Sequence, residues 1–160
     1  MRAYRSTMAR ITVSTTIDAS PAAVWAAVED VGSHVEWMAD AEAIRFTSDH
    51  TSGVGTTFEC DTKVGPLRLT DLMEITRWEP GTAMGVRHVG LVTGEGAFTL
   101  APAGRHLRRR GGTRFEWSER LVFPWWMGGP IGGIVGGRIM RVIWKGNLRR
   151  LKAIVEGQQA

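Results

Sequence analysis

Apolar and polar residues alternate along much of this chain, and the alternation predicts its strands. In residues 10–17, Ile11, Val13 and Ile17 fall on one side, which is the period-two pattern of a strand with one buried face. Turns rich in Gly and Pro separate the later runs. Six further strands are predicted at residues 42–48, 56–64, 67–78, 83–89, 92–100 and 113–123. Their short connections favour an antiparallel meander.

A helical pattern lies between the first and second predicted strands. Ser20 is suited to cap a helix N-terminus, and Pro21 is suited to its first position. The apolar residues that follow at helical spacing are Val24, Trp25 and Val28. We expect Gly32 to end this helix and a second short helix to run over residues 33–37.

One long helix is predicted from Pro130 onward. Its charged face carries Arg138, Arg141, Lys145, Arg149, Lys152 and Glu156. Its apolar face carries Met140, Trp144, Leu148, Leu151, Ile154 and Val155. The order of one strand, two short helices, six strands and a long helix predicts an α+β domain.

Residues 121–137 carry no charge, so a membrane span has to be considered. The stretch contains two Pro and six Gly among 17 residues. It is also shorter than the roughly 20 apolar residues that a spanning helix needs. We therefore expect no transmembrane helix here.

The element order and several local features resemble those of the START and polyketide cyclase superfamily, whose architecture is the helix-grip or SRPBCC fold. The features are Ile17, Ser20-Pro21, Val24-Trp25, Asp30-Val31, Trp37, Trp78-Glu79-Pro80, Gly112-Thr113 and the run LRRLKAIVEG at 148–157. The resemblance spans residues 10–157. It implies a seven-stranded curved antiparallel sheet wrapped around the C-terminal helix, with a cavity between them. Members bind lipids, sterols, polyketides and other apolar ligands, and some are cyclases or aromatases. The family has no universal catalytic motif, so no activity transfers by name.

Length and composition limit the alternatives. The 160 residues suit one domain, expected at 10–157 after a flexible lead at 1–9 that lacks the apolar run of a secretory signal. The lone cysteine, Cys60, excludes a disulfide within the chain and fits a reducing compartment, so we predict a cytoplasmic protein. The net charge of +4 does not argue for a nucleic-acid partner, and none is expected. Nothing in the sequence indicates the oligomeric state.

The more apolar face of each strand is assigned to the inside of the sheet, because side chains on a strand alternate. These inward residues, together with the glycine-rich start of the long helix and the Trp pair before it, define a predicted ligand-binding set. The set is Phe58, Cys60, Leu69, Asp71, Met73, Met84, Val86, His88, Phe98, Phe115, Trp117, Glu119, Leu121, Trp126, Gly133, Gly136 and Met140. Cys60 is interpreted as a core residue rather than a nucleophile.

Three ionisable residues fall on the predicted inner face: Asp71, His88 and Glu119. An unpaired buried charge is costly, so such groups must pair, face water or serve a ligand. They are therefore structurally paired, exposed to solvent near a strand end, or the polar anchors of an apolar pocket. The histidines show no metal-ligand spacing, and the Gly pairs at 128–137 lack the Lys and Ser/Thr of a phosphate-binding loop. No metal or nucleotide cofactor is expected.

Four glycines at the start of the long helix project to the same side as Met140 and Trp144. They are Gly132, Gly133, Gly136 and Gly137. Each costs about 1 kcal/mol relative to Ala in a helix. Room for a ligand, close backbone packing or a later helix start would each account for them.

Three functions fit this sequence. The first is binding or transport of a hydrophobic small molecule or lipid in an internal cavity. The second is a polyketide cyclase or aromatase, cyclase/dehydratase-like, in which His88 with Glu119 or Asp71 would move protons. The third is a membrane-surface or partner-regulating module that uses Trp125, Trp126 and the basic hairpin at Arg105–Arg110.

Overall fold

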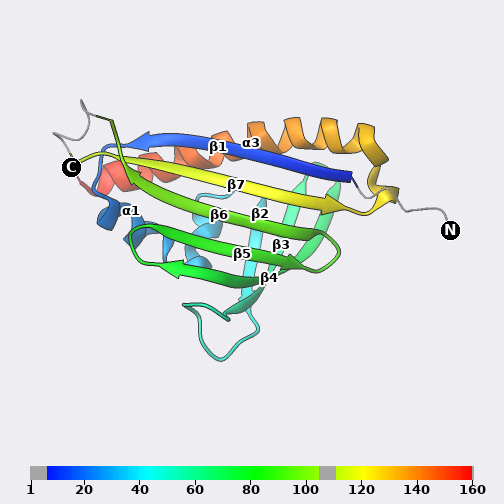
Figure 1. Cartoon of the computed structure of the whole chain (residues 1–160), viewed down its shortest axis with the longest axis horizontal. Coiled ribbons are helices and arrows are strands. Elements are labelled where there is room, and N and C mark those ends of the chain that lie inside the picture. The colour runs from blue at the N-terminus through cyan, green and yellow to red at the C-terminus, as the bar shows by residue number, and fades with distance from the viewer. Residues whose placement is uncertain (1–6, 105–110, 160) are drawn as a thin grey trace.

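The computed structural model describes residues 7–104 and 111–159, which form one seven-stranded antiparallel sheet and its helices (Figure 1). The strands are β1 (Thr7–Ile17), β2 (Ala41–Phe46), β3 (Thr57–Val64), β4 (Leu67–Glu79), β5 (Ala83–Val89), β6 (Thr93–Pro102) and β7 (Thr113–Phe123). Their order in the sheet is β1-β7-β6-β5-β4-β3-β2. The predicted meander is thus confirmed, and the first strand closes it by pairing with the last.

The sheet is strongly twisted along its length. In Figure 1, β2 and β3 run steeply across the direction taken by β5, β6 and β7. Register shifts interrupt the pairing of β2 with β3 between Ala41 and Ala43, and that of β4 with β5 between Ile75 and Arg77. Such irregularities increase the local twist and help a sheet to curve. The curvature turns one face of the sheet toward the helices.

Two short helices follow β1, as predicted. Helix α1 (Pro21–Val28) begins with Pro at its first turn, and the Ser20 side chain accepts a hydrogen bond from the Ala23 N–H at 3.2 Å. The boundary expected at Gly32 is wrong. The second helix, η1 (Val31–Glu36), is a 3₁₀ helix that starts before Gly32, because Asp30 caps it by accepting a hydrogen bond from the Gly32 N–H at 3.0 Å.

The long helix α3 (Gly129–Gln158) runs along the length of β1, after a short 3₁₀ turn η2 (Trp125–Met127) (Figure 1). Trp144, Leu148, Leu151 and Val155 are buried, as their spacing predicted. Two members of the predicted charged face instead contact the chain around the end of β1. Lys152 donates to the Thr16 carbonyl at 2.6 Å, and Glu156 accepts from the Asp18 N–H at 2.9 Å.

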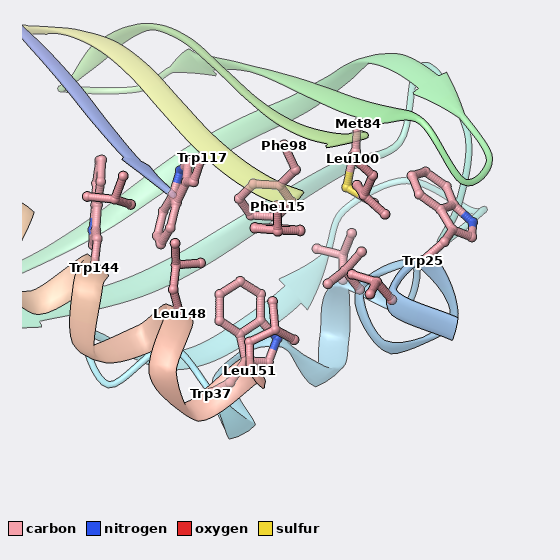
Figure 2. Packing of buried hydrophobic residues seen from close by; sticks show 14 of the residues in the cluster. Trp25, Trp37, Met84, Phe98, Leu100, Phe115, Trp117, Trp144, Leu148 and Leu151 are labelled. Carbon is pink, nitrogen blue, oxygen red and sulfur yellow. The ribbon is translucent and has the colours of Figure 1, made fainter. Parts of the chain in front are cut away.

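The hydrophobic core lies under the C-terminal half of α3. Figure 2 shows Trp144, Leu148 and Leu151 rising from the helix toward Trp117 and Phe115 on the sheet. The Trp117 and Trp144 rings stack with centroids 4.2 Å apart. Toward its N-terminus the same helix face has glycines instead of large side chains, so the core ends near Met140.

The membrane question is answered for the part of the chain that the structure describes: none of its helices is both long and apolar enough to cross a bilayer. The stretch at 121–137 is divided between the end of β7, η2 and the start of α3. The basic hairpin predicted at Arg105–Arg110 lies outside the described residues.

Candidate functional site

A cavity of about 110 Å³ lies between the sheet and the helices. We call it the inner cavity. Many of the predicted ligand contacts line it: Phe58, Cys60, Asp71, Met73, Met84, Val86, His88, Phe98, Trp117, Glu119, Leu121 and Met140. The structure adds further lining residues that the sequence analysis did not assign to the site: Val31, His34, Met38, Asp40, Ala41, Ile44, Thr62, Ala97 and Trp144. Most of these come from the segment after α1, whose position over the sheet is a tertiary feature that periodicity does not reveal.

A second hollow, of about 240 Å³, lies beside the first. Leu69, Gly133 and Gly136 of the predicted set line this hollow and not the inner cavity. Gly132 also lines it, and Met140 lines both spaces. We call it the glycine hollow. A Cβ atom built at Gly136 would meet no other atom within 4 Å, so close packing does not account for this glycine. At Gly132, by contrast, a Cβ would crowd the Met127 carbonyl.

Two residues of the predicted set line neither hollow. Phe115 is fully buried in the core, where its ring lies 5.2 Å from that of Phe98. Trp126 is 57% exposed, because the η2 turn after β7 directs its side chain away from the interior. An inward position on a strand is therefore not enough to reach the cavity, since the core occupies one end of the inner face.

Asp71, His88 and Glu119 meet in the wall of the inner cavity. The His88 ring bridges the two carboxylates, with Nδ1 at 2.7 Å from Asp71 Oδ2 and Nε2 at 2.8 Å from Glu119 Oε2. Trp117 donates its indole N–H to Glu119 Oε1 at 2.9 Å. The three residues come from β4, β5 and β7, and His88 and Glu119 are buried. We call this the Asp-His-Glu cluster.

Glycines on β6 allow the cluster to form. Because neighbouring strands are about 4.8 Å apart, His88 on β5 and Glu119 on β7 must meet across the strand between them. On β6, Gly94 lies opposite His88 and Gly96 lies opposite Glu119. A Cβ atom at Gly96 would overlap the Glu119 carboxylate. The missing side chain therefore provides the space in which the carboxylate reaches the imidazole.

The Asp-His-Glu cluster is a charged unit. Burial by itself lowers the pKa of His88, but the hydrogen bonds to Asp71 and Glu119 outweigh it and raise the pKa to about 10. At neutral pH the ring is therefore protonated and donates from both nitrogens.

One acceptor in the cluster has no partner. The Asp71 Oδ1 atom is buried and accepts no hydrogen bond from any described residue. The Asp71 side chain as a whole is 13% exposed, so it lies at the edge of the buried part of the wall. A buried acceptor without a donor costs roughly 1–3 kcal/mol. A donor group on a molecule inside the cavity would remove that cost.

Two further side chains in the wall, His34 and Cys60, are uncharged at neutral pH. Burial lowers the pKa of His34 to about 4, and its Nε2 donates to the Val28 carbonyl at 2.7 Å. Burial raises the pKa of the Cys60 thiol to about 11, so a thiolate nucleophile is not available at neutral pH. Within residues 7–104 and 111–159, no three His, Cys, Asp or Glu side chains are placed to hold a metal ion.

The fold and this cavity define a class of protein: a helix-grip domain, in which a curved sheet closes on a C-terminal helix around an apolar space. The family model for polyketide cyclase / dehydrase and lipid transport matches residues 8–156. The chain therefore belongs to this family, as its sequence resemblance to the START and polyketide cyclase superfamily implied.

Solved structures share the fold at low sequence identity. The aromatase/cyclase ZhuI of Streptomyces sp. R1128 is 12% identical with a TM-score of 0.78, and the match covers 96% of each chain. The protein TTHA0849 of Thermus thermophilus is 16% identical with a TM-score of 0.77, covering 94% of this chain and 99% of the other. A START superfamily protein of Mycobacterium smegmatis is 11% identical with a TM-score of 0.73, covering 93% and 98%. A search of curated protein sequences finds no match.

Proposed function

We propose that the chain binds an apolar small molecule or lipid in the inner cavity and holds it by one hydrogen-bond donor, such as a hydroxyl. The observation that carries this proposal is the unpartnered Asp71 Oδ1 in the wall of an otherwise mostly apolar cavity. Binding sites for small molecules commonly combine apolar walls with a few placed polar groups. The description of the family, which includes lipid transport, supports the same function.

A matched pair of single-ring probes tests this proposal. The probes are 4-methylphenol and 1,4-dimethylbenzene, two single-ring molecules of nearly equal size. They differ in the hydroxyl alone. We expect the phenol to bind about 10- to 100-fold more tightly, because a hydrogen bond to a charged acceptor contributes roughly 1.5–3 kcal/mol. Affinities are measured by NMR titration.

The variant Asp71→Asn should reduce this preference, because a neutral amide is a weaker acceptor than a carboxylate. The control is Glu74→Gln, which changes a carboxylate on the same strand that pairs instead with Arg87. Equal affinity for the two probes, or a preference that survives Asp71→Asn unchanged, would show that Asp71 does not anchor the ligand.

A second candidate function is a cyclase- or dehydratase-type enzyme. The observation that favours it is the protonated His88 held between two carboxylates inside the cavity. Both ring nitrogens already contact carboxylates, so the atom that faces a substrate is Asp71 Oδ1. In this mechanism Asp71 Oδ1 takes a proton from the carbon next to a carbonyl or from a hydroxyl, which leaves an enolate or an alkoxide on the substrate. Glu119 keeps the His88 cation paired while Asp71 is neutral.

The enzyme proposal separates from simple binding through Glu119→Gln. This change removes one of the two carboxyl groups that raise the pKa of His88, and it leaves the Asp71 Oδ1 atom unchanged. Conversion of a linear poly-β-ketone into an aromatic product, followed by absorbance, should fall about 100-fold or more. The control Glu116→Gln alters a carboxylate on β7 that contacts Arg114 instead. Equal conversion by both variants and the wild type would leave binding as the function.

We also propose a peripheral contact with an anionic lipid surface. Several apolar residues near the start of α3 are exposed: Trp125, Trp126, Ile134, Val135, Ile139 and Val142. Arg138 and Arg141 lie exposed on the same part of the helix. Tryptophan and basic residues together are typical of surfaces that meet a bilayer interface. The exposed helix residues extend the contact that the sequence analysis assigned to Trp125 and Trp126.

A further inference from the structure

The inner cavity alone is small for a ligand of this family. Its volume of about 110 Å³ lies below the roughly 300–1,000 Å³ of ordinary small-molecule sites. The neighbouring glycine hollow has about 240 Å³ and is lined mainly by apolar side chains and glycines. Thr62 and Met140 line both spaces. Together the two hollows reach the size of an ordinary site, and these two residues form a wall that both share.

The glycine hollow is not an unavoidable gap in the packing, because the backbone around it would accept a larger side chain. Protein interiors are normally close-packed, and a larger side chain would fill such a gap. At Gly136 a Cβ would meet nothing within 4 Å, so the backbone itself would admit one. Glycine there also weakens the helix relative to Ala. The sequence therefore keeps the hollow open where a stabilising residue would fit.

The residue between the hollows is of a type that moves readily. Met140 is half-buried, and methionine has an unbranched side chain with three rotatable bonds. Because Met140 lines both hollows, a change of its rotamer would alter the boundary between them. The polar atoms of the Asp-His-Glu cluster lie on the inner-cavity side of this boundary, and mainly apolar walls lie on the other side.

We propose that the ligand is an amphiphile with one hydrogen-bond donor at its head and a single aliphatic tail. The head contacts Asp71 in the inner cavity, and the tail passes Met140 into the glycine hollow beneath Gly136. This inference rests on the proposed binding function and adds the shape of the ligand to it. The tail is a flexible chain because it must pass between Thr62 and Met140.

A series of 4-alkylphenols, from methyl to hexyl, measures the tail directly. In the wild type, calorimetry should show affinity increasing about threefold to fourfold per added methylene, as expected for burial of apolar groups. Gly136→Leu fills the glycine hollow and should remove most of this increase, while the affinity for 4-methylphenol stays unchanged.

Gly137→Leu is the matched control. Gly137 is the next residue of the same helix, and its Cβ would also meet nothing within 4 Å, but it faces a groove beside Met8 and Ala9. Both substitutions raise helix propensity by the same amount. Gly137→Leu should leave the whole series as in the wild type.

The outcomes are distinguishable. If both leucine variants retain the full increase, the tail lies elsewhere and the inference is wrong. If 4-methylphenol binds in an Asp71-dependent way but longer tails add nothing, the inference fails while the proposed function stands. If no phenol binds the wild type at all, the proposed function fails and the inference fails with it.

Discussion

The Asp-His-Glu cluster depends on the absence of a side chain at Gly96. The sequence showed that Asp71, His88 and Glu119 lie on the inner faces of three strands, because alternation assigns faces. It did not show that they touch. Their contact depends on the relative registers of β4, β5, β6 and β7, and one of these pairings contains a register shift. Alternation also places Gly94 and Gly96 of β6 on the inner face, but it does not reveal their effect on the neighbouring strand.

Gly96→Ala tests that dependence. The new methyl group would overlap the Glu119 carboxylate, so Glu119 must leave His88 or the sheet must shift. Overpacking of this kind costs about 1–3 kcal/mol of unfolding free energy, measured by urea denaturation. In the control Gly104→Ala the Cβ meets nothing within 4 Å, and stability should change by less than about 0.5 kcal/mol. Equal effects of the two changes would mean that the sheet accommodates the methyl group.

The charge on His88 makes stability depend on pH. Its folded pKa of about 10 lies above the ordinary value of 6.5, since contact with Asp71 and Glu119 outweighs burial. The protonated ring therefore stabilises the fold fully below about pH 6.5. This contribution decreases above that pH and is lost as the pH passes about 10.

His88→Gln removes the titrating group. The pH dependence should therefore appear as a difference in stability between the wild type and this variant. The stability advantage of the wild type over His88→Gln, from urea unfolding at several pH values, should shrink between pH 7 and pH 10. His50→Gln changes an exposed histidine and should give no such trend. A wild-type advantage that is constant across this range would show that His88 is not held as a cation.

At the scale of elements, strand positions and the long helix were predictable from periodicity and turn residues. Three features were not. The 3₁₀ helix η1 begins before Gly32, because the cap at Asp30 decides its start. The exposed apolar residues Ile134, Val135 and Val142 do not follow the single apolar face expected for α3. The junction between α3 and the segment after η1 relies on Asn147, whose role no periodic pattern indicates.

Asn147 joins the helix to the cavity wall. Its side chain is fully buried, accepts from the Ala39 N–H at 2.9 Å and donates to Asp40 Oδ1 at 2.7 Å. Trp144 also donates to Asp40, and both Asp40 and Trp144 line the inner cavity. The contacts of Asn147 therefore position two residues of the wall.

Asn147→Ala removes these bonds and leaves Asp40 with one donor fewer. The unfolding free energy, from chemical denaturation, should fall by about 2–4 kcal/mol, because two partly buried hydrogen bonds are lost and one of them is to the Asp40 side chain. Arg150→Ala removes only the weaker 3.2 Å contact to Asn147 and serves as the control, with a loss below about 1 kcal/mol. Similar losses for both variants would mean that Asn147 does not hold this junction.

For the whole molecule, element order was enough to predict a sheet closed on a helix. The division of the interior into the inner cavity and the glycine hollow was not predictable, because the shape of such spaces depends on side-chain volumes and strand curvature. The exposure of apolar residues near the start of α3 was not predictable either, because it depends on how the helix packs against the rest of the chain. This surface provides the test of a lipid contact.

The double variant Trp126→Ala/Val142→Ser should reduce co-sedimentation with vesicles that contain phosphatidylglycerol. These side chains are 57% and 73% exposed, so both are available to a bilayer. Binding of the wild type should also weaken as salt rises, since Arg138 and Arg141 would face anionic headgroups. Val54→Ser changes another exposed apolar residue, on the loop between β2 and β3, and should have no effect. Equal sedimentation of all three proteins would exclude this surface.

The pairing of β1 with β7 has a consequence for synthesis and folding. Thr7 pairs with Phe123 and Ile17 with Thr113, so the first strand made has no partner until the seventh has left the ribosome. Contacts between such distant parts of a chain slow folding. Glu119 and Met140 are also among the later residues to be made, and without them neither hollow has its wall. It follows that a nascent chain cannot capture the ligand before Met140 has been made and the sheet has closed.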